Sequence, residues 1–199
     1  MLETLIRPKS IAIIGASRNP GKVGYSILAN LISSGYEGKI IPVNPQAEEI
    51  LGLKCYKSPK DAGIPIDLSI IVVPSKLVKS AIEESALAGA KSVCVITAGF
   101  KEIGPEGALL EKEIANYCKE HRIRLLGPNC LGIINTENKM NASFATQMPR
   151  QGSISVISQS GALCTAILDW SVGRGIGLAK LISIGNKADI CEIDLLQML

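Results

Sequence analysis

The chain has 199 residues, of which 47% are hydrophobic and 20% are charged, and its formal net charge at neutral pH is +3. This hydrophobic content is sufficient for a buried core, whereas the small and dispersed positive charge argues against nucleic acid or an anionic membrane as the main partner. The segment Met1 to Pro8 contains Glu3 and Arg7 and lacks the apolar run of a signal peptide or a membrane span. We therefore expect a soluble globular protein of the cytoplasm.

The six cysteines are scattered along the chain, and no two of them form a C-x-x-C pair. Such paired spacings are typical of metal sites, and the single histidine, His121, cannot complete one alone. We expect His121 at a helix end, as a capping or solvent-facing residue. The sequence predicts no bound metal, and reduced cysteines that pack as small hydrophobic residues.

In chain order, the first signal is the stretch from Ser10 to Gly24. Four apolar residues at 11–14 predict a buried strand, and a helical pattern begins at Val23. The loop between them carries three glycines and two cations, namely Gly15, Gly21, Gly24, Arg18 and Lys22. The unpaired N–H groups and positive dipole end of such a helix attract phosphate. We therefore predict a phosphate-binding loop, with an ordinary strand-to-helix turn as the alternative.

The loop does not match the dinucleotide fingerprint G-x-G-x-x-G, because Ala16 and Ser17 stand where the second glycine is needed. The next strand ends at Asn44-Pro45, where a Rossmann NAD site carries an acidic residue for the ribose. Glu48 and Glu49 follow too late to replace it. These two features argue against a nicotinamide cofactor.

Strand and helix patterns alternate as far as residue 132. This alternation predicts an α/β fold, a Rossmann-like doubly wound parallel sheet with right-handed crossovers. The loops that follow the strands then lie along one edge, where such sheets bind ligands. These loops are residues 15–24, 44–45, 74–75, 97–99 and 127–129.

Residues 133–152 are polar and irregular, which predicts a connector between a first domain at 1–132 and a second at 153–199. The second domain is expected to contain two strand–helix units, whose last helix runs from Asp189 to Leu199. So small a unit leaves its sheet poorly covered. We therefore expect the chain to be part of a longer protein.

The turn between the first strand and helix of this second unit reads Ser158-Gln159-Ser160-Gly161. Its two hydroxyls and its glycine directly precede a helix. Such a turn can cap the helix, or it can hold a phosphoryl group at the helix amino end. From these residues alone, both interpretations remain open.

The ordered set of motifs resembles the ADP-forming acyl-CoA synthetases, relatives of the succinyl-CoA synthetase alpha subunit, over almost the whole chain. The motifs are Gly15 to Gly24, Val73-Pro74, Ile96 to Gly99, Gly127 to Gly132, Ser158 to Leu163 and Ser183 to Asp189. The closing Gly-Asn-Lys-Ala-Asp is similar to the acetate–CoA ligase branch. The resemblance implies a CoA-binding Rossmann-like domain, followed by the first part of a flavodoxin-like ligase domain.

The resemblance also implies roles for residues of the strand-ending loops. Contacts with coenzyme A are implied for Gly15, Ser17, Arg18, Asn19, Gly21, Pro74, Thr97, Ala98, Gly99 and Asn129. Of these, the first loop would hold the phosphates of the coenzyme, and Asn129 would lie near its thiol end. A phosphoryl group carried on a histidine would bind at Ser158, Gln159, Ser160 and Gly161.

The family reaction interconverts acyl-CoA, phosphate and ADP with free acid, CoA and ATP, through an acyl phosphate and a phosphohistidine. By resemblance, the phosphohistidine lies beyond Leu199. An ATP-grasp beta subunit or fused ATP-grasp domain would bind ATP or ADP and Mg²⁺ outside this chain. The resemblance further implies a small carboxylic acid as substrate, with acetate favoured, and an oligomeric assembly.

Two positions depart from the succinyl branch. Ala47 stands near the position at which the succinyl branch places a lysine against CoA, so that phosphate contact is not expected here. Thr165 stands where that branch carries a tyrosine linked to its substrate pocket, which argues against succinate as the acid. Two other functions remain open on the sequence. One is a non-catalytic CoA-binding regulatory domain of a protein acetyltransferase, which the downstream sequence would distinguish. The other is an NAD-binding oxidoreductase or redox sensor, which relative affinities for NAD and CoA would distinguish.

Overall fold

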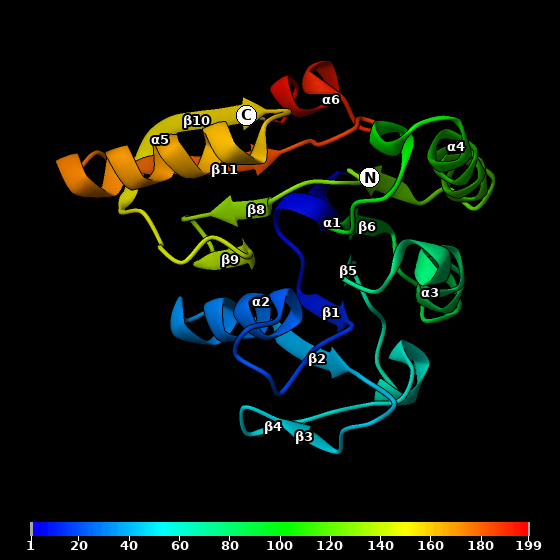
Figure 1. The fold of residues 1–199 in the computed structure, drawn as a ribbon. Helices are drawn as coiled ribbons and strands as arrows, with labels where there is room; N and C mark the ends of the chain where they lie inside the picture. The colour runs from blue at the N-terminus through cyan, green and yellow to red at the C-terminus, as the bar shows by residue number, and fades with distance from the viewer. Residues whose placement is uncertain (1, 199) are drawn as a thin grey trace.

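A computed structural model describes residues 2–198 as two larger sheets flanked by helices, with a separate two-stranded hairpin (Figure 1). The first sheet is entirely parallel, in the order β2-β1-β5-β6-β7. Its strands are β1 (Ser10–Ile14), β2 (Lys39–Val43), β5 (Leu68–Ile71), β6 (Ser92–Val95) and β7 (Arg124–Leu126). The order reverses between β1 and β5, which is the place where doubly wound sheets bind ligands.

Helices cover both faces of this sheet because alternate residues of its strands point to opposite sides. Ile11 and Ile13 pack in one core cluster with helix α2 (Val23–Ser33), whereas Ile14 packs in another with α3 (Ser75–Leu87). Helix α4 (Pro105–Glu120) lies on the same face as α3. The predicted doubly wound α/β fold is therefore confirmed.

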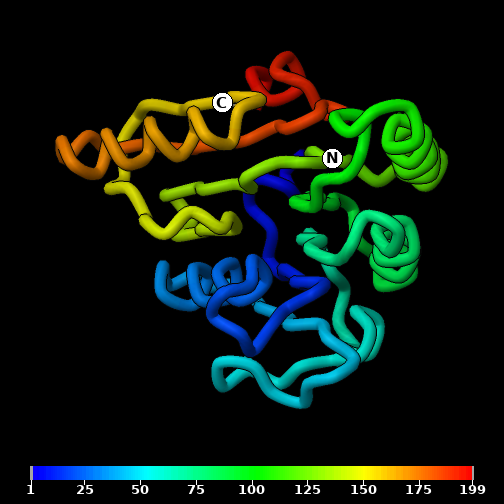
Figure 2. The backbone as a smooth tube through the Cα atoms, viewed as in Figure 1, coloured from blue at the N-terminus to red at the C-terminus, as the bar shows by residue number. Residues whose placement is uncertain are grey.

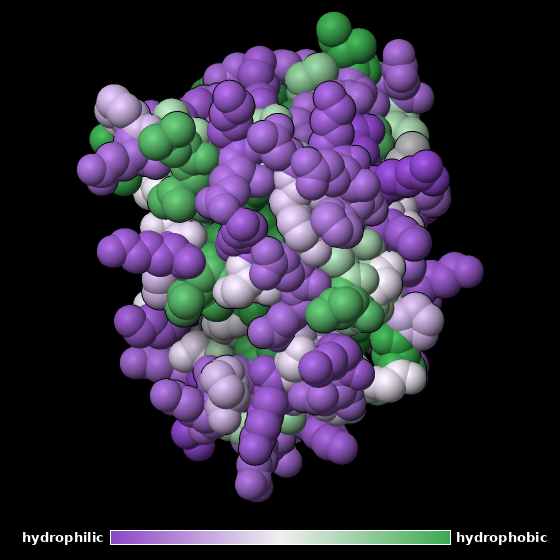
Figure 3. Space-filling model, turned by 90° about the vertical axis from the view of Figure 1, so that its right-hand side faces the viewer, coloured by the Kyte–Doolittle hydropathy of each residue, from purple (hydrophilic) through white to green (hydrophobic). Residues whose placement is uncertain are grey.

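Several short elements complete this part of the chain. They are α1 (Glu3–Ile6), β3 (Glu49–Ile50), β4 (Leu53–Lys54) and the 3₁₀ helices η1 (Pro59–Ala62) and η2 (Lys101–Ile103). Strands β3 and β4 form a hairpin beyond β2 (Figure 1). The face that carries α3 and α4 is largely hydrophilic, with separate small hydrophobic patches (Figure 3).

The second sheet has the order β10-β11-β8-β9. Its strands are β8 (Gly132–Asn135), β9 (Met140–Ser143), β10 (Gln151–Ser158) and β11 (Leu178–Ser183), and its helices are α5 (Gly161–Arg174) and α6 (Glu192–Leu196). Strands β10 and β11 are parallel, and the pairs β11–β8 and β8–β9 are antiparallel. No helix among residues 2–198 is long and apolar enough to cross a membrane.

The predicted irregular connector at 133–152 is wrong, because β8 and β9 occupy much of this segment. Its polar residues indicate a loop, but several of them are buried and have hydrogen-bond partners inside the protein. Asn135 Nδ2 donates to the carbonyl of Ile6 over 2.9 Å, and Ser143 Oγ donates to Asn141 Oδ1 over 2.6 Å. Buried polar groups with such partners are compatible with a strand. The division into two domains remains a prediction.

The last helix is shorter than predicted. Helix α6 spans only Glu192–Leu196, and the predicted final position, Leu199, lies outside the described residues. Asp189 does not start the helix, because its carboxylate accepts hydrogen bonds of 2.9 Å from Arg124 Nε and from the main-chain N–H of Leu125. These contacts hold the residue against β7.

Helix α2 joins the two sheets. Asn30 Nδ2 donates to the carbonyls of Ser143 and Ala145 over 2.8 and 2.6 Å. One core cluster contains Ile27 and Leu31 of α2 together with Met140 of β9. The tube in Figure 2 shows this proximity, with the β8–β9 segment beside α2. The two units are therefore packed together through a shared hydrophobic core.

The first loop depends on a close approach of α2 to the end of β1. A Cβ atom on Gly24 would overlap the carbonyl oxygen of Gly15. Gly15 itself has a φ of +94°, and a Cβ there would lie 2.8 Å from the carbonyl oxygen of Val72. Only glycine fits such contacts without displacement of the backbone.

We expect the substitution Gly24→Ala to lower the free energy of unfolding by at least about 2 kcal/mol, because the added methyl group pushes α2 away from β1. The matched control is Gly173→Ala in α5, where an added Cβ meets nothing within 4 Å. That change is expected to be neutral or to stabilise by roughly 0.5–1 kcal/mol. Urea denaturation of both variants measures the difference, and equal effects would contradict the packing argument.

Candidate functional site

A cleft of about 910 Å³ lies at the carboxyl ends of the first sheet's strands, facing the amino end of α5. We call it the main cleft. It brings together predicted residues from the loops after β5, β6 and β7 and from the turn before α5, namely Pro74, Thr97, Ala98, Asn129, Gln159, Ser160 and Gly161. Lys22 and Val23, at the start of α2, line it as well. The amino ends of α2 and α5 thus line one cavity, although α2 follows a strand of the first sheet and α5 follows a strand of the second.

The remaining predicted residues do not line the main cleft. They are Gly15, Ser17, Arg18, Asn19, Gly21, Gly99 and Ser158. In the first loop, two of these side chains support the turn itself. Ser17 Oγ accepts from the N–H of Asn19 over 3.0 Å, and Asn19 Oδ1 accepts from the N–H of Gly21 over 2.9 Å. Such local bonds pre-organise a loop.

Some main-chain N–H groups of the first loop are hydrogen-bonded within the protein, and others remain available to a ligand. The N–H groups of Gly15 and Ala16 donate to the carbonyl of Val43, over 3.0 and 3.2 Å. The amino end of α2 has no side-chain cap among the described residues. The N–H of Tyr25 donates to the carbonyl of Lys22 over 3.0 Å, so within residues 2–198 the N–H groups of Val23 and Gly24 are the donors of this turn that remain available to an anion.

At α5, the capping interpretation of Ser160 is confirmed. Its Oγ accepts from the N–H of Leu163 over 3.2 Å, and Ser158 Oγ accepts from the N–H of Ser160 over 3.1 Å. Within residues 2–198, the N–H groups of Gly161 and Ala162 have no hydrogen-bond partner. Both residues line the main cleft, so the capped helix still offers donors there.

The cysteines near the site are buried thiols. All six are free, and all but Cys191 are buried. Cys130 lines the main cleft, and its sulfur lies 3.7 Å from that of Cys94. The hydrogen bond with Cys130 and burial together raise the pKa of Cys94 well above its ordinary value. Cys94 is therefore a protonated thiol at neutral pH, in agreement with the predicted structural role.

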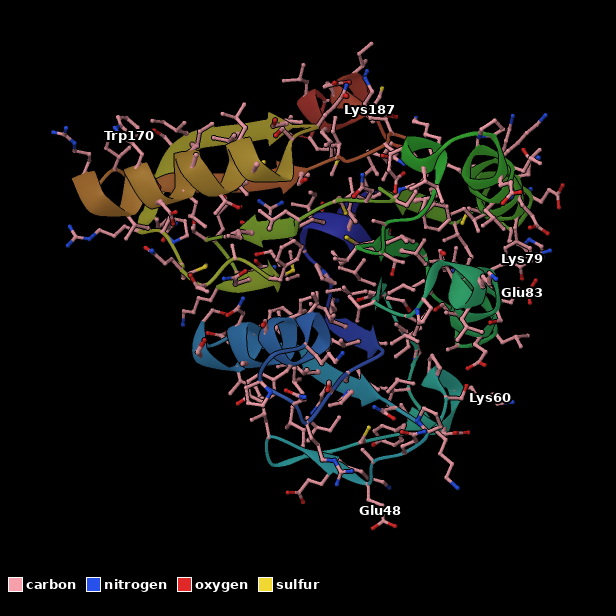
Figure 4. The ribbon with its side chains drawn as sticks, viewed as in Figure 1. Glu48, Lys60, Lys79, Glu83, Trp170 and Lys187 are labelled. Atoms are coloured by element: carbon pink, nitrogen blue, oxygen red, sulfur yellow. The ribbon has the colours of Figure 1, made fainter. Side chains whose placement is uncertain are left out.

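A contact between two loops behind the main cleft was not predicted. The N–H of Asn186 donates to the carbonyl of Pro128 over 2.9 Å, and the N–H of Ala188 donates to the carbonyl of Gly127 over 3.0 Å. Asn186 Oδ1 also accepts from Asn129 Nδ2 over 3.3 Å. The Gly-Asn-Lys-Ala-Asp motif therefore positions the loop that carries Asn129. Lys187, within it, pairs with Glu192 over 3.2 Å, and Figure 4 labels it near α6.

The side-chain amide of Asn186 also binds two glutamates. Its Nδ2 donates to Glu102 Oε2 over 2.6 Å and to Glu111 Oε2 over 2.8 Å. Glu102 Oε1 accepts from the N–H groups of Gly99 and Phe100. The main-chain N–H of Gly99, a predicted contact of coenzyme A, is therefore bonded to Glu102 inside the protein. Burial raises the pKa of Glu102, but the bonds from Asn186 and these N–H groups outweigh it, so the pKa lies below its ordinary value.

Two features of the site are not predicted from the sequence, namely the contact made by the motif at 185–189 and the position of Phe144 in the main cleft. The motif at 185–189 was available as a family pattern, but a pattern does not say which loop it contacts. Phe144 lines the main cleft and is 39% exposed, yet it lies in the segment that was interpreted as a connector. Its isolated position among polar residues carried no periodic signal.

Because the pKa of Glu102 is lowered on folding, its contribution to stability is present above the ordinary pKa of glutamate and lost as pH falls through the lowered value. We expect Glu102→Gln to destabilise by on the order of 1 kcal/mol at neutral pH, after solvent screening, because the amide cannot accept on both sides. The deficit should shrink below about pH 4. Denaturation across pH measures it.

The control for this pH dependence is Glu48→Gln, since the Glu48 side chain projects into solvent (Figure 4). Its substitution should change stability little at any pH. A deficit in Glu102→Gln that persists unchanged to acid pH would contradict the role of the carboxylate.

The strand order, the glycine turn after β1 and a cleft at the strand ends define a doubly wound α/β protein of the kind that binds ligands at this edge. Residues 9–136 match the CoA binding domain, and residues 151–199 match the succinyl-CoA ligase like flavodoxin domain. The chain therefore belongs to the CoA binding domain family. The resemblance to ADP-forming acyl-CoA synthetases is confirmed by the relatives below.

An acetate–CoA ligase (ADP-forming) of Methanocaldococcus jannaschii is 50% identical over 98% of the chain and 27% of its own length. The alpha subunit of acetate–CoA ligase (ADP-forming) I of Pyrococcus furiosus is 44% identical over 98% of the chain and 43% of its own length. The chain thus spans less than half of these relatives.

A solved structure of the dinucleotide forming acetyl-coenzyme A synthetase 1 of Ca. Korarchaeum cryptofilum, in complex with phosphate and ADP, superposes with a TM-score of 0.96. It is 41% identical and covers 100% of the chain and 42% of that protein's chain.

Proposed function

We propose that this chain is the CoA-binding part of an ADP-forming acyl-CoA synthetase that acts on acetate. One observation carries the proposal, namely that the amino ends of α2 and α5 open onto the same cleft. Each end offers main-chain N–H groups and a positive dipole, which suit a coenzyme phosphate and a transferred phosphoryl group, respectively. The named relatives are acetate–CoA ligases that form ADP.

In this proposal the chain binds and orients. The loop from Gly15 to Gly24 holds the diphosphate of coenzyme A, with Arg18 and Lys22 as counter-charges. Asn129 is assigned to the thiol end of the coenzyme by the resemblance, and its position in the lining of the main cleft supports this role. The N–H groups of Gly161 and Ala162 stabilise negative charge on the phosphoryl group.

The chemistry of the complete protein requires further parts. We propose a histidine outside this chain as the phosphate carrier, because His121 is exposed at the end of α4, stacked on Tyr117. An ATP-grasp subunit or domain would bind ADP or ATP with Mg²⁺. The alpha-subunit name of the Pyrococcus furiosus relative supports a separate partner. A cytoplasmic, oligomeric enzyme remains part of the proposal.

No observation favours a nicotinamide site. Strand β2 ends at Asn44, whose Nδ2 donates to the carbonyl of Ala16 over 2.7 Å and so braces the first loop. An amide in this place does not supply the two acceptor oxygens with which an acidic residue holds ribose hydroxyls.

We expect the chain to bind coenzyme A more tightly than NAD in isothermal titration calorimetry, and to catalyse no turnover alone. Lys22→Ala should weaken coenzyme A binding about tenfold, because it removes a cation from the main cleft. Lys39→Ala is the matched control, since Lys39 begins β2 at the opposite end of the sheet. The absence of coenzyme A binding, or tighter NAD binding, would count against the proposal.

The proposed phosphoryl site at the amino end of α5 can be tested by removal of one N–H donor. Proline is tolerated at the first helical position, and Ser160 already has the extended backbone that precedes proline. We expect Gly161→Pro to weaken the binding of inorganic phosphate about tenfold, because the Gly161 N–H is lost. Gly161→Ala keeps that N–H and serves as control. Phosphate titrations followed by NMR measure both, and equal affinities would rule out this donor.

A further inference from the structure

The side chain of Asn186 lies behind the main cleft, between two glutamates and Asn129. Its Nδ2 donates to Glu102 Oε2 over 2.6 Å and to Glu111 Oε2 over 2.8 Å. Ionised carboxylates accept hydrogen bonds and donate none, so the nitrogen of this amide must face the glutamates. The amide oxygen of Asn186 is therefore left to face Asn129.

Both glutamates are held in place as acceptors. Glu111 is 6% exposed, and its Oε1 lies 3.1 Å from Lys101 Nζ. Glu102 Oε1 accepts from two main-chain N–H groups of the loop after β6, which leaves Oε2 for Asn186. A reversed Asn186 amide would place its oxygen against two carboxylates and would lose both hydrogen bonds. Only one orientation of this amide thus suits its surroundings.

The orientation of Asn186 determines that of Asn129. Asn129 Nδ2 donates to Asn186 Oδ1 over 3.3 Å, and a rotated Asn129 amide would instead oppose two oxygens. The Asn129 main chain is fixed as well, with a φ of +57° and an N–H that donates to the carbonyl of Thr97 over 3.0 Å. No residue from 2 to 198 donates to Asn129 Oδ1, and Asn129 lines the main cleft. Its oxygen is therefore the acceptor that Asn129 offers to a ligand.

Thr97 offers a second acceptor in the lining of the same cleft. Its Oγ1 donates to the carbonyl of Val73 over 2.7 Å, so the hydroxyl hydrogen is used and the oxygen can only accept from a ligand. The amino ends of α2 and α5, by contrast, offer N–H donors. A ligand that binds across the cleft thus needs anionic groups for the helix ends and N–H or S–H donors for Asn129. Coenzyme A has both, because its diphosphate is anionic and its pantetheine arm carries amide N–H groups and a thiol.

We propose that Asn186 is a positioning residue for coenzyme A: together with Glu102 and Glu111, it fixes the Asn129 amide so that Oδ1 accepts from an N–H or S–H group of the pantetheine arm. This inference rests on the proposed function and adds to it the residue that orients Asn129. Without the Asn186 oxygen, the Asn129 amide has two rotamers of similar energy, and in one of them the nitrogen faces the ligand donor. The hydrogen bond to the ligand is then lost.

The test is a double-mutant cycle, measured by isothermal titration calorimetry of this chain with coenzyme A. We expect Asn186→Leu, which has no polar side-chain atom, to weaken coenzyme A binding about fivefold, as for the loss of a neutral hydrogen bond. Asn129→Ala should weaken binding at least as much. In the variant with both substitutions, Asn186→Leu should have no further effect, because it acts only through Asn129. Asn186→Ser repeats the cycle with a shorter side chain that can still donate to one glutamate.

Two controls separate positioning from a general structural effect. Adenosine 3′,5′-bisphosphate lacks the pantetheine arm, so its affinity should be the same for the unmodified chain and for Asn186→Leu. Lys187→Ala changes the next residue of the same motif, which Figure 4 labels near α6 and whose Nζ lies 3.2 Å from Glu192 Oε2. This variant should keep full affinity for coenzyme A.

Unchanged coenzyme A affinity in both Asn186 variants overturns the role of Asn186. Effects at Asn129 and Asn186 that simply add, or an equal loss of affinity for both ligands, overturn it as well. The proposed function stands in each of these cases. Failure of the unmodified chain to bind coenzyme A overturns both.

Discussion

The site depends on one contact that involves no side chain. Gly24, in the first turn of α2, lies against the carbonyl of Gly15 at the end of β1. This approach sets the amino end of α2 directly at the edge of the sheet, beside the reversal of strand order. A methyl group on Gly24 would separate the helix from the strand, and one on Gly15 would collide with the carbonyl of Val72 after β5. The donors of the helix would then no longer be held above the strand ends.

The second sheet also presents a helix amino end at a strand-to-helix turn, but this turn uses serines. Strand β10 passes into α5 through two serines, and Ser160 caps the helix while its first N–H groups stay unpaired within residues 2–198. The two turns open onto one cleft because α2 packs on β9, with Asn30 bonded to main-chain carbonyls across the junction. Behind the cleft, Asn186 connects the two sheets' loops through Asn129 and Glu102. Packing between the units thus determines what the separate turns can bind together.

Most of the first sheet was predictable, because buried parallel strands appear as short apolar runs between helical patterns. The segment of β8 and β9 was not. Its buried Asn135 donates to the carbonyl of the distant residue Ile6, and its buried Ser143 donates to the side chain of Asn141, so the polarity of these residues indicates a loop only when their partners are unknown. The start of the last helix failed for a similar reason, since Asp189 caps no helix and binds Arg124 instead.

By itself, the sequence determined which strands of the first sheet are buried, which turns carry glycines and hydroxyls, and the family to which the ordered motifs belong. These properties follow from local periodicity and from residue types that impose backbone conformations. Only the tertiary structure decided that Ser17 and Asn19 support their own loop, that Asn186 contacts Asn129, and that both helix ends share a cleft. Such facts depend on contacts between residues far apart in the chain, which no local pattern encodes.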